Sequence, residues 1–199
     1  MPKITANSLM TLESYNKQRP QIRDSVMAHK KNRKVHLGEN VTLIFEDEMT
    51  MRYQVQEMLR AEKIFDEAGI LDEIAAYNPL IPDGSNWKAT MMIEYPDPIE
   101  RAARLATLMG IEEKVWVKVA GYNPVYAIAD EDLERNTEEK TSSVHFLRFE
   151  LARKMIQALH QGTALSMGID HRAYQALVEP VNAAVRDSLI KDFNGLTAK

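Results

Sequence analysis

The segment that decides the fold reads Val35-His36-Leu37-Gly38-Glu39-Asn40-Val41-Thr42-Leu43-Ile44-Phe45. Apolar side chains alternate with polar ones in residues 35–37 and recur in residues 41–45, which is typical of strands that bury one face of a sheet. Gly38-Glu39-Asn40 lies between the two runs and predicts a short turn. The segment therefore predicts a β-hairpin with two antiparallel strands.

The rest of the chain repeats this pattern of strands and short turns, with helical segments grouped between them. Strand-like runs cover residues 87–95, 115–119, 125–129, 143–151 and 163–169. Helical spacing of apolar residues covers residues 48–67, 70–77, 98–110, 153–160 and 181–193. We therefore predict an α+β fold with a mainly antiparallel sheet, helices packed on it, and a single domain over residues 1–199.

Proline and glycine mark several predicted boundaries. Residues 1–34 are predicted to form a basic helical segment packed on the domain, in two pieces, with Pro20 starting the second piece. Gly69 is predicted to end the long helix that begins near Glu48. The prolines and the Pro82-Asp83-Gly84 turn predict a shaped loop over residues 78–87 that has no regular structure.

The composition excludes several classes of function. The chain has 25 basic and 29 acidic side chains and a formal net charge of −4, so no overall positive field attracts nucleic acids or anionic membranes. It has no cysteine, which excludes disulfides, thiolate metal sites and cysteine nucleophiles. No apolar run is long enough for a membrane span or a secretory signal. We therefore predict a cytoplasmic protein without membrane or nucleic-acid partners.

A local cluster of basic residues contrasts with the negative net charge. Its members are Arg19, Arg23, Lys30, Lys31, Arg33 and Lys34. The cluster predicts a solvated face, with a patch for a phosphate or an acidic partner as the alternative. Glycine-rich nucleotide-binding motifs and the nucleophile elbow of hydrolases are absent from the sequence. We therefore expect no cofactor.

The predicted strand around His145 carries the first candidate site residues. Strand geometry places Arg148 and Glu150 on one face and His145, with Leu147 and Phe149, on the other. Arg148 and Glu150 are predicted to pair with groups on a neighbouring strand, in a structural rather than a catalytic role. His145 is interpreted as a hydrogen-bonded core histidine, with an acid, base or ligand role as the alternative.

Asp170 and His171 follow the strand predicted over residues 163–169 and form the second candidate pair. Asp170 is predicted to cap the next turn, with orientation of an imidazole as the alternative. A metal site would need a third ligand, for which His145 is the available donor, but the sequence shows no metal-ligand spacing. We therefore expect no metal.

The long helix and the shaped loop supply the candidate binding site. Polar side chains recur on one helical face at four-residue intervals, and the loop brings further polar groups if it folds back toward this helix. The residues predicted to surround a small polar ligand or a partner are Arg52, Gln56, Arg60, Asp83, Ser85, Asn86 and, as a wall, Trp87. A solvated helix face is the alternative.

Three long phrases of the chain resemble a known family. They are Tyr77–Thr90, Tyr53–Arg60 and Ser143–Glu150, and they are similar to the bacterial family catalogued as domain of unknown function 3501. The resemblance spans nearly the whole chain and implies a stand-alone bacterial protein, in gene neighbourhoods with rubrerythrin-like and iron–sulfur redox proteins. It implies no catalytic residues. A chain without cysteine cannot hold a conventional iron–sulfur cluster, so the resemblance implies an accessory role beside such systems.

Two hypotheses for the function follow. The first is a binding or accessory protein in which the sheet and the loop over residues 78–87 form a docking surface, within a homo-oligomer or for an unidentified protein partner or small polar ligand. The second is an enzyme with a small polar pocket, in which His145 or His171 acts as acid or base and Arg52, Arg60 or Arg148 binds an anion.

Overall fold

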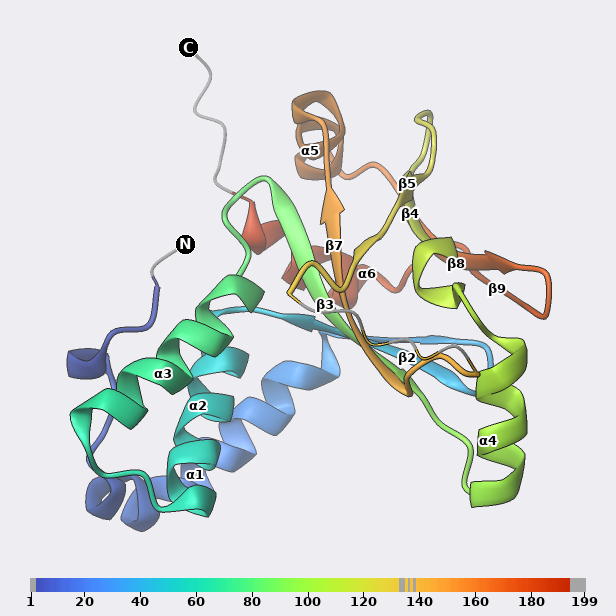
Figure 1. Ribbon diagram of the computed structural model, residues 1–199. Coiled ribbons are helices and arrows are strands. Elements are labelled where there is room, and N and C mark those ends of the chain that lie inside the picture. The colour runs from blue at the N-terminus through green and yellow to red at the C-terminus, as the bar shows by residue number, and fades with distance from the viewer. Residues whose placement is uncertain (1–2, 133–134, 136, 138, 194–199) are drawn as a thin grey trace.

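The computed structural model describes residues 3–132, 135, 137 and 139–193. Within them it has six α-helices and two antiparallel sheets, which confirms the α+β fold class and divides the strands between two sheets (Figure 1). The strands are β1 (Lys34–Leu37), β2 (Val41–Glu46), β3 (Asn86–Ile93), β4 (Val115–Val119), β5 (Val125–Tyr126), β6 (Ile128–Ala129), β7 (Val144–Glu150), β8 (Leu165–His171) and β9 (Tyr174–Val178). The α-helices are α1 (Leu12–Lys31), α2 (Glu48–Glu62), α3 (Glu67–Tyr77), α4 (Pro98–Thr107), α5 (Arg153–His160) and α6 (Ala183–Leu189). Short 3-10 helices are η1 (Ala6–Ser8), η2 (Asn78–Leu80), η3 (Ile111–Lys114) and η4 (Ile190–Asp192).

The first sheet, in the order β1-β2-β3-β7-β6, is built outward from the predicted hairpin. Val35 pairs with Leu43 and Leu37 pairs with Val41, which confirms the hairpin. β3 pairs with β2 on one side and with β7 on the other, so Asn86 lies opposite Glu150. The loop before Trp87 and the later strand region therefore lie side by side.

The main core lies between the two sheets. One hydrophobic cluster contains buried side chains of the first sheet, of the second sheet in the order β5-β4-β8-β9, and of α4, α5 and α6. In β3 the odd-numbered residues from Trp87 to Ile93 are buried in this cluster, and the even-numbered ones, such as Lys88, point to the other face. Strand alternation thus separates a buried core face of the first sheet from a partly exposed opposite face.

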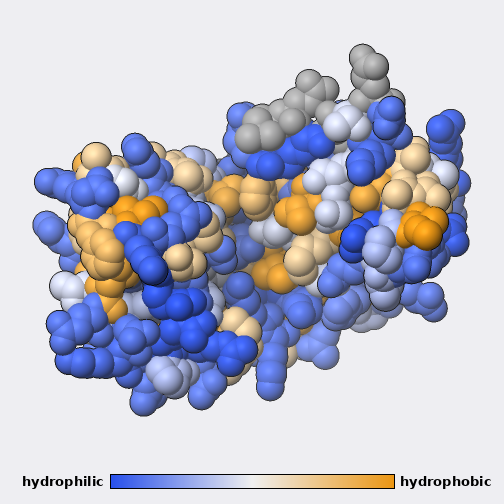
Figure 2. Space-filling view, turned by 60° about the horizontal axis from the view of Figure 1, so that its bottom comes forward, coloured by the Kyte–Doolittle hydropathy of each residue, from blue (hydrophilic) through white to orange (hydrophobic). Residues whose placement is uncertain are grey.

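A separate hydrophobic cluster holds the N-terminal helices together. It contains buried side chains of α2 and α3 together with Ile4 and Ile81. In Figure 1, α1, α2 and α3 stand together on one side of the first sheet. Figure 2 shows a depression between this helical side, on the left, and the side that carries α4, on the right. Among the described residues, no helix has the length and apolarity needed to cross a membrane.

The N-terminal helix is continuous, so the predicted break at Pro20 is wrong. The Thr11 side chain caps α1 by accepting a hydrogen bond from the Ser14 backbone N–H at 3.3 Å. Pro20 removes one backbone hydrogen bond from the helix interior. Arg19 forms an ion pair with Glu57 of α2 just before Pro20, and Val26 is buried after it, so contacts on both sides keep the helix in one line.

The long helix predicted to end at Gly69 is two helices. α2 ends at Glu62, and Lys63 adopts the left-handed conformation with φ 57° while its N–H donates to the Leu59 carbonyl. This conformation costs a non-glycine residue roughly 1 kcal/mol, which the packing of α3 against α2 offsets. Gly69 instead lies in the first turn of α3, where its N–H donates to the Asp66 carboxylate at 2.8 Å.

The second half of the chain differs from the prediction in three places. The strand predicted over residues 125–129 divides into β5, which pairs with β4, and β6, which pairs with β7 of the other sheet. β9 was not predicted. β8 continues through His171, so Asp170 lies opposite Gln175 within a strand pair and does not cap a turn.

Candidate functional site

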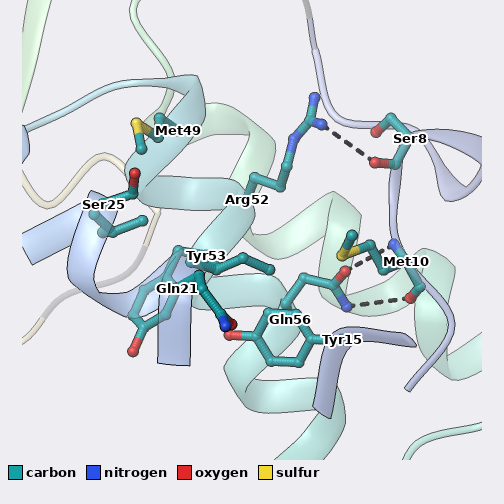
Figure 3. Close-up of a pocket in the computed structure, with 11 residues that line it drawn as sticks. Ser8, Met10, Tyr15, Gln21, Ser25, Met49, Arg52, Tyr53 and Gln56 are labelled. Carbon is teal, nitrogen blue, oxygen red and sulfur yellow. Dashed lines mark hydrogen bonds between the residues drawn. The ribbon is translucent and has the colours of Figure 1, made fainter. Parts of the chain in front are cut away.

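A pocket that contains predicted site residues lies between α1 and α2 (Figure 3). The segment before α1 crosses α2 and closes one side of it. The Gln56 side chain accepts a hydrogen bond from the Met10 N–H at 2.8 Å and donates one to the Met10 carbonyl at 3.4 Å. Arg52 donates to the Ser8 carbonyl at 3.3 Å. Gln56, which we predicted as a ligand-binding residue, is thus buried and holds this wall in place.

The cavity is amphipathic and has a volume of about 450 Å³. Its apolar lining consists of Met10, Ile22, Val26 and Met49. Its polar lining consists of Ser8, Tyr15, Gln21, Ser25, Arg52, Tyr53 and Gln56. A few polar groups set in a largely apolar wall, at this volume, are typical of sites for small organic molecules.

Arg52 is the cationic side chain in the lining of this cavity. Its Nε donates to the Glu48 carboxylate at 2.7 Å, one helical turn away, and its side chain remains 43% exposed. Figure 3 shows its guanidinium extended toward the backbone at Ser8. An exposed pair of this kind is held weakly, so the guanidinium can rearrange to meet an anionic group.

A charged cluster next to the cavity ties α1 to α2. Arg19 donates to both carboxylate oxygens of Glu57 at 2.8 Å, and the buried Tyr15 hydroxyl donates to the same carboxylate at 2.6 Å. The hydrogen bonds from Arg19 lower the pKa of Glu57 to about 2. Burial, with the bond to Glu57, raises the pKa of Tyr15. Arg60, another predicted site residue, lies 3.5 Å from Glu57 and supports this cluster.

We expect Glu57→Gln to lower the free energy of unfolding by about 2 kcal/mol at pH 7, less than the pKa shift alone implies because Arg19 is partly exposed. The folded-state pKa of about 2 lies below the unfolded value of 4.5, so this stabilisation is complete above about pH 4.5 and is lost as the pH falls toward 2. Urea denaturation of the parent and the Glu57→Gln protein at pH 7 and pH 3 measures this difference in the free energy of unfolding. Glu62→Gln, at an exposed position of the same helix, is the control and should change little.

The loop residues predicted to face α2 lie elsewhere. The Ser85 backbone N–H donates to Asp83 at 3.0 Å, the Ser85 hydroxyl donates to Glu150 at 2.5 Å, and the Asn86 amide donates to Glu150 at 3.2 Å. The structure therefore places Asp83, Ser85 and Asn86 at the ends of β3 and β7 and not around Arg52 and Arg60. Trp87 is 0% exposed and lies in the core, so it does not form the predicted wall.

Two predicted residues of β7 are engaged by the acidic stretch that follows β6. Arg148 donates to Glu131 at 2.7 and 2.8 Å and to Glu150 at 2.8 Å. His145 is 0% exposed, with Nδ1 2.6 Å from the Asp130 carboxylate and Nε2 2.9 Å from the Thr141 hydroxyl. The acidic stretch over residues 130–140 thus begins with two residues, Asp130 and Glu131, that bind side chains of β7. Glu134 and Glu138 lie outside the described residues.

The second candidate pair, Asp170 and His171, does not share a pocket with His145. His171 is buried, its Nε2 lies 3.2 Å from the Met109 carbonyl, and its Nδ1 accepts from the Ala173 N–H at 3.2 Å. Asp170 points to the opposite face of β8 and is exposed. Among the described residues, no group of three or more potential ligands is placed to hold a metal ion.

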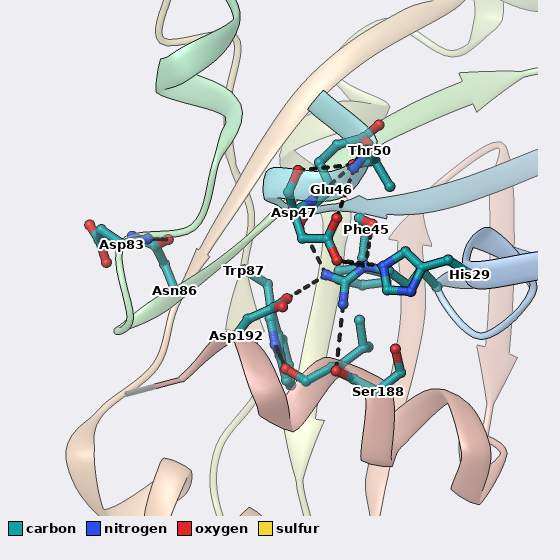
Figure 4. A network of polar contacts seen from close by, with 12 residues as sticks. His29, Phe45, Glu46, Asp47, Thr50, Asp83, Asn86, Trp87, Ser188 and Asp192 are labelled. Atoms are coloured by element: carbon teal, nitrogen blue, oxygen red, sulfur yellow. Dashed lines mark hydrogen bonds and ion pairs between the residues drawn. The ribbon is translucent and has the colours of Figure 1, made fainter. Parts of the chain in front are cut away.

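A buried ionic network that we did not predict joins α1, β2 and the C-terminal helices (Figure 4). Arg33 is 1% exposed and donates to Asp192 at 2.5 Å, while its Nε lies 3.4 Å from Asp47. His29 Nε2 lies 2.5 Å from Asp47, and its imidazole lines a 260 Å³ pocket with Lys191. Arg33 is therefore not part of a solvated basic face. The only local sequence signal for this network is Asp47, a residue type that commonly caps a helix. The pairing of Arg33 with Asp192 has no local signal, because 159 residues separate them.

Comparison with known proteins yields a family and a solved structure without an assigned activity. A family model described as protein of unknown function (DUF3501) matches residues 3–193. A crystal structure of a novel protein of unknown function from Burkholderia pseudomallei K96243 is 53% identical with a TM-score of 0.93, and the match covers 97% of this chain and 100% of that chain. No curated protein matches the chain.

Proposed function

We propose a ligand-binding function for this chain, which belongs to the DUF3501 family of proteins of unknown function. The single observation that carries the proposal is the amphipathic cavity of about 450 Å³ between α1 and α2. Its volume lies within the range of small-molecule sites, and its lining combines apolar side chains with convergent polar groups. The role is that of a binding or accessory protein.

The chemistry of the lining defines the class of ligand. Met10 and Met49 supply flexible, polarisable surface that adapts to an apolar body. Arg52 supplies a planar guanidinium that binds carboxylates and sulfonates through two parallel hydrogen bonds. The ligand is therefore a small organic anion with an apolar or aromatic body and one acidic head group.

The alternative, an enzyme that uses His145 or His171 as acid or base, has less support. Both imidazoles are buried, and both ring nitrogens of each lie within hydrogen-bond distance of protein groups. An acid or base must come within hydrogen-bond reach of its substrate. His29 combines a carboxylate partner with a position on a pocket wall, so the enzyme alternative is better tested at His29.

Anilinonaphthalene sulfonate, a fluorescent dye with an aromatic body and a sulfonate group, is the probe for the cavity. We expect saturable binding to the folded protein, and Arg52→Met should weaken it about tenfold through loss of a charged hydrogen bond. Ser25→Trp should abolish it, because the indole fills the cavity that Ser25 lines. Fluorescence titration measures the dissociation constants.

The matched control is Arg104→Met. Arg104 forms an exposed pair with Glu100 one turn away on α4, as Arg52 does with Glu48 on α2, but it does not line the cavity. Thermal unfolding of each variant shows whether the fold is retained. Equal dye affinity in the parent, Arg52→Met and Ser25→Trp proteins contradicts the proposal.

Three further expectations stay predictions. A link to oxidative-stress or iron–sulfur redox systems comes from the family resemblance, and a cytoplasmic location comes from the composition. A protein partner or a homo-oligomer is compatible with a binding protein, and light scattering of the purified protein measures the oligomeric state.

A further inference from the structure

Lys88 lies on the central strand of the first sheet and points away from the main core. It lies on β3, which is flanked by β2 and β7 (Figure 1). Its cross-strand partners are Glu46 on one side and Arg148 on the other. Directly opposed side chains on one face of an antiparallel pair lie about 5 Å apart at Cβ, so the lysine amine and the Arg148 guanidinium are close neighbours.

The half-buried Lys88 amine forms no hydrogen bond or ion pair with any residue that the structure describes. The carboxylates near it are engaged by other donors. Glu131 binds Arg148, and Glu150 binds Arg148, Ser85 and Asn86. Glu46 accepts from the hydroxyls of Thr50 and Thr90, and Asp83 accepts from Ser85. The amine is therefore left free in a partly dry environment.

The amine lines a cavity of about 390 Å³. Pro79, Leu80 and Phe146 supply apolar wall, and Glu131 and Asp132 lie at its acidic side. Burial, together with the charge of Arg148, lowers the pKa of Lys88, while the surrounding carboxylates oppose this change. Desolvation beside a second cation is the arrangement that activates a lysine as a nucleophile at neutral pH.

We propose that Lys88 is a nucleophilic amine that condenses with small neutral aldehydes or ketones in this cavity. The neutral amine attacks the carbonyl carbon, a C–N bond forms, and a proton moves from nitrogen to the carbonyl oxygen to give a carbinolamine. Loss of water from the carbinolamine gives the imine. No oxidant or reductant takes part in this step.

The charges around Lys88 favour neutral carbonyl compounds over anionic ones. Arg148 already binds Glu131 through two nitrogens and Glu150 through the third, so it has little capacity to receive a substrate carboxylate. Asp132 at the same wall is ion-paired with Arg135, so this second guanidinium is occupied as well. Phe146 lines the cavity with its ring, over which the Arg135 guanidinium lies at 4.5 Å from the centroid, and it can contact an aromatic aldehyde.

Reductive trapping on the intact protein tests the proposal. Benzaldehyde and cyanoborohydride are added at pH 7, hydride reduces any imine to a stable benzylamine, and mass spectrometry measures the rate of modification at each lysine. Lys118 is the matched internal control, because it is also a partly buried strand lysine that forms no hydrogen bond or ion pair with a residue that the structure describes, but Ser166 lies opposite it. We expect Lys88 to be modified several-fold faster than Lys118. We also expect the pH midpoint of the Lys88 rate to lie below the usual pKa of a lysine side chain.

Two comparisons make the outcome decisive. Glyoxylate replaces benzaldehyde as an anionic probe, and the ratio of the Lys88 rate to the Lys118 rate, which cancels the intrinsic reactivity of each aldehyde, should be smaller with glyoxylate. A larger ratio with glyoxylate overturns the assignment to neutral carbonyl compounds. Lys88→Arg should remove the fast-reacting site and leave the rate at Lys118 unchanged. Modification of Lys88 no faster than Lys118 overturns the proposal. None of these results depends on dye binding between α1 and α2, so the two proposals fail independently.

Discussion

Replacing Arg33 with methionine is expected to lower the free energy of unfolding by about 3–5 kcal/mol at neutral pH. The guanidinium is 1% exposed and compensates two buried carboxylates, Asp47 and Asp192. It also donates to the carbonyl oxygens of Phe45 at 2.8 Å and Glu46 at 3.0 Å. Methionine fills much of the volume but leaves these acceptors and charges without a partner.

The cost of this substitution should depend on pH. Burial raises the pKa of Asp192 from 3.8 to about 6, even with Arg33 beside it. A carboxyl group whose pKa is higher in the folded than in the unfolded state destabilises the folded protein as the pH rises from the unfolded-state pKa through the folded-state pKa. Loss of Arg33 raises this pKa further, so Arg33→Met should be more damaging at pH 8 than at pH 5, where Asp192 is protonated.

Urea denaturation at pH 5 and pH 8 measures both effects. The double variant Arg33→Met, Asp192→Leu should recover part of the loss, because it removes one of the uncompensated charges together with its partner. Arg23→Met, at an exposed position on α1, is the control and should change the free energy of unfolding by less than about 0.5 kcal/mol. An Arg33→Met protein as stable as the Arg23→Met protein shows that the network contributes nothing.

Replacing Trp87 with alanine is expected to cost about 3–5 kcal/mol and to lower the melting temperature by roughly 10 °C. The indole is 0% exposed and packs edge-on against Phe45, with 5.9 Å between ring centroids, and at a tilt against Phe193, with 4.9 Å between ring centroids. Its N–H donates to the Leu189 carbonyl at 2.9 Å. The substitution leaves a large cavity and also frees the C-terminal helices from the sheet.

Thermal unfolding and limited proteolysis measure the two consequences of Trp87→Ala separately. Cleavage near α6 should rise sharply. Trp87→Phe keeps most of the volume and should lose mainly the hydrogen bond, at about 1 kcal/mol. The other tryptophan, Trp116, lies partly exposed over Gly168 on the second sheet, so Trp116→Ala should cost clearly less. Equal costs for the two alanine variants contradict the assignment of Trp87 to the main core.

Local patterns in the sequence predicted most elements of the fold. The hairpin around Gly38, the strand over residues 143–151 and the helix over residues 153–160 all have signals within a few residues of themselves. Pro20 and Gly69 misled the prediction because tertiary contacts decide whether a proline or glycine ends a helix. β9 was missed because it is short and only partly buried.

The site was less predictable because its residues meet through distant contacts. Arg52 and Gln56 were selected from helical spacing and do line the cavity, but their neighbours come from α1 and the segment before it. Asp83, Ser85 and Asn86 were expected near them because the loop was assumed to fold toward α2. The register between β3 and β7 decides instead that Ser85 and Asn86 bind Glu150, while Asp83 binds Ser85, and a strand register is not visible in periodicity alone.

The partners of Arg33 and Trp87 lie near the end of the described residues, so these contacts can form only late in the synthesis of the chain. Arg33 precedes Asp192 by 159 residues, and Trp87 precedes Leu189 by 102. At ribosomal rates of about 5–20 residues per second, Asp192 is synthesised roughly 8 to 30 seconds after Arg33. Until α6 and η4 emerge, the nascent protein carries an unmatched guanidinium and an open tryptophan pocket, and it is most exposed to aggregation and chaperone capture during that interval.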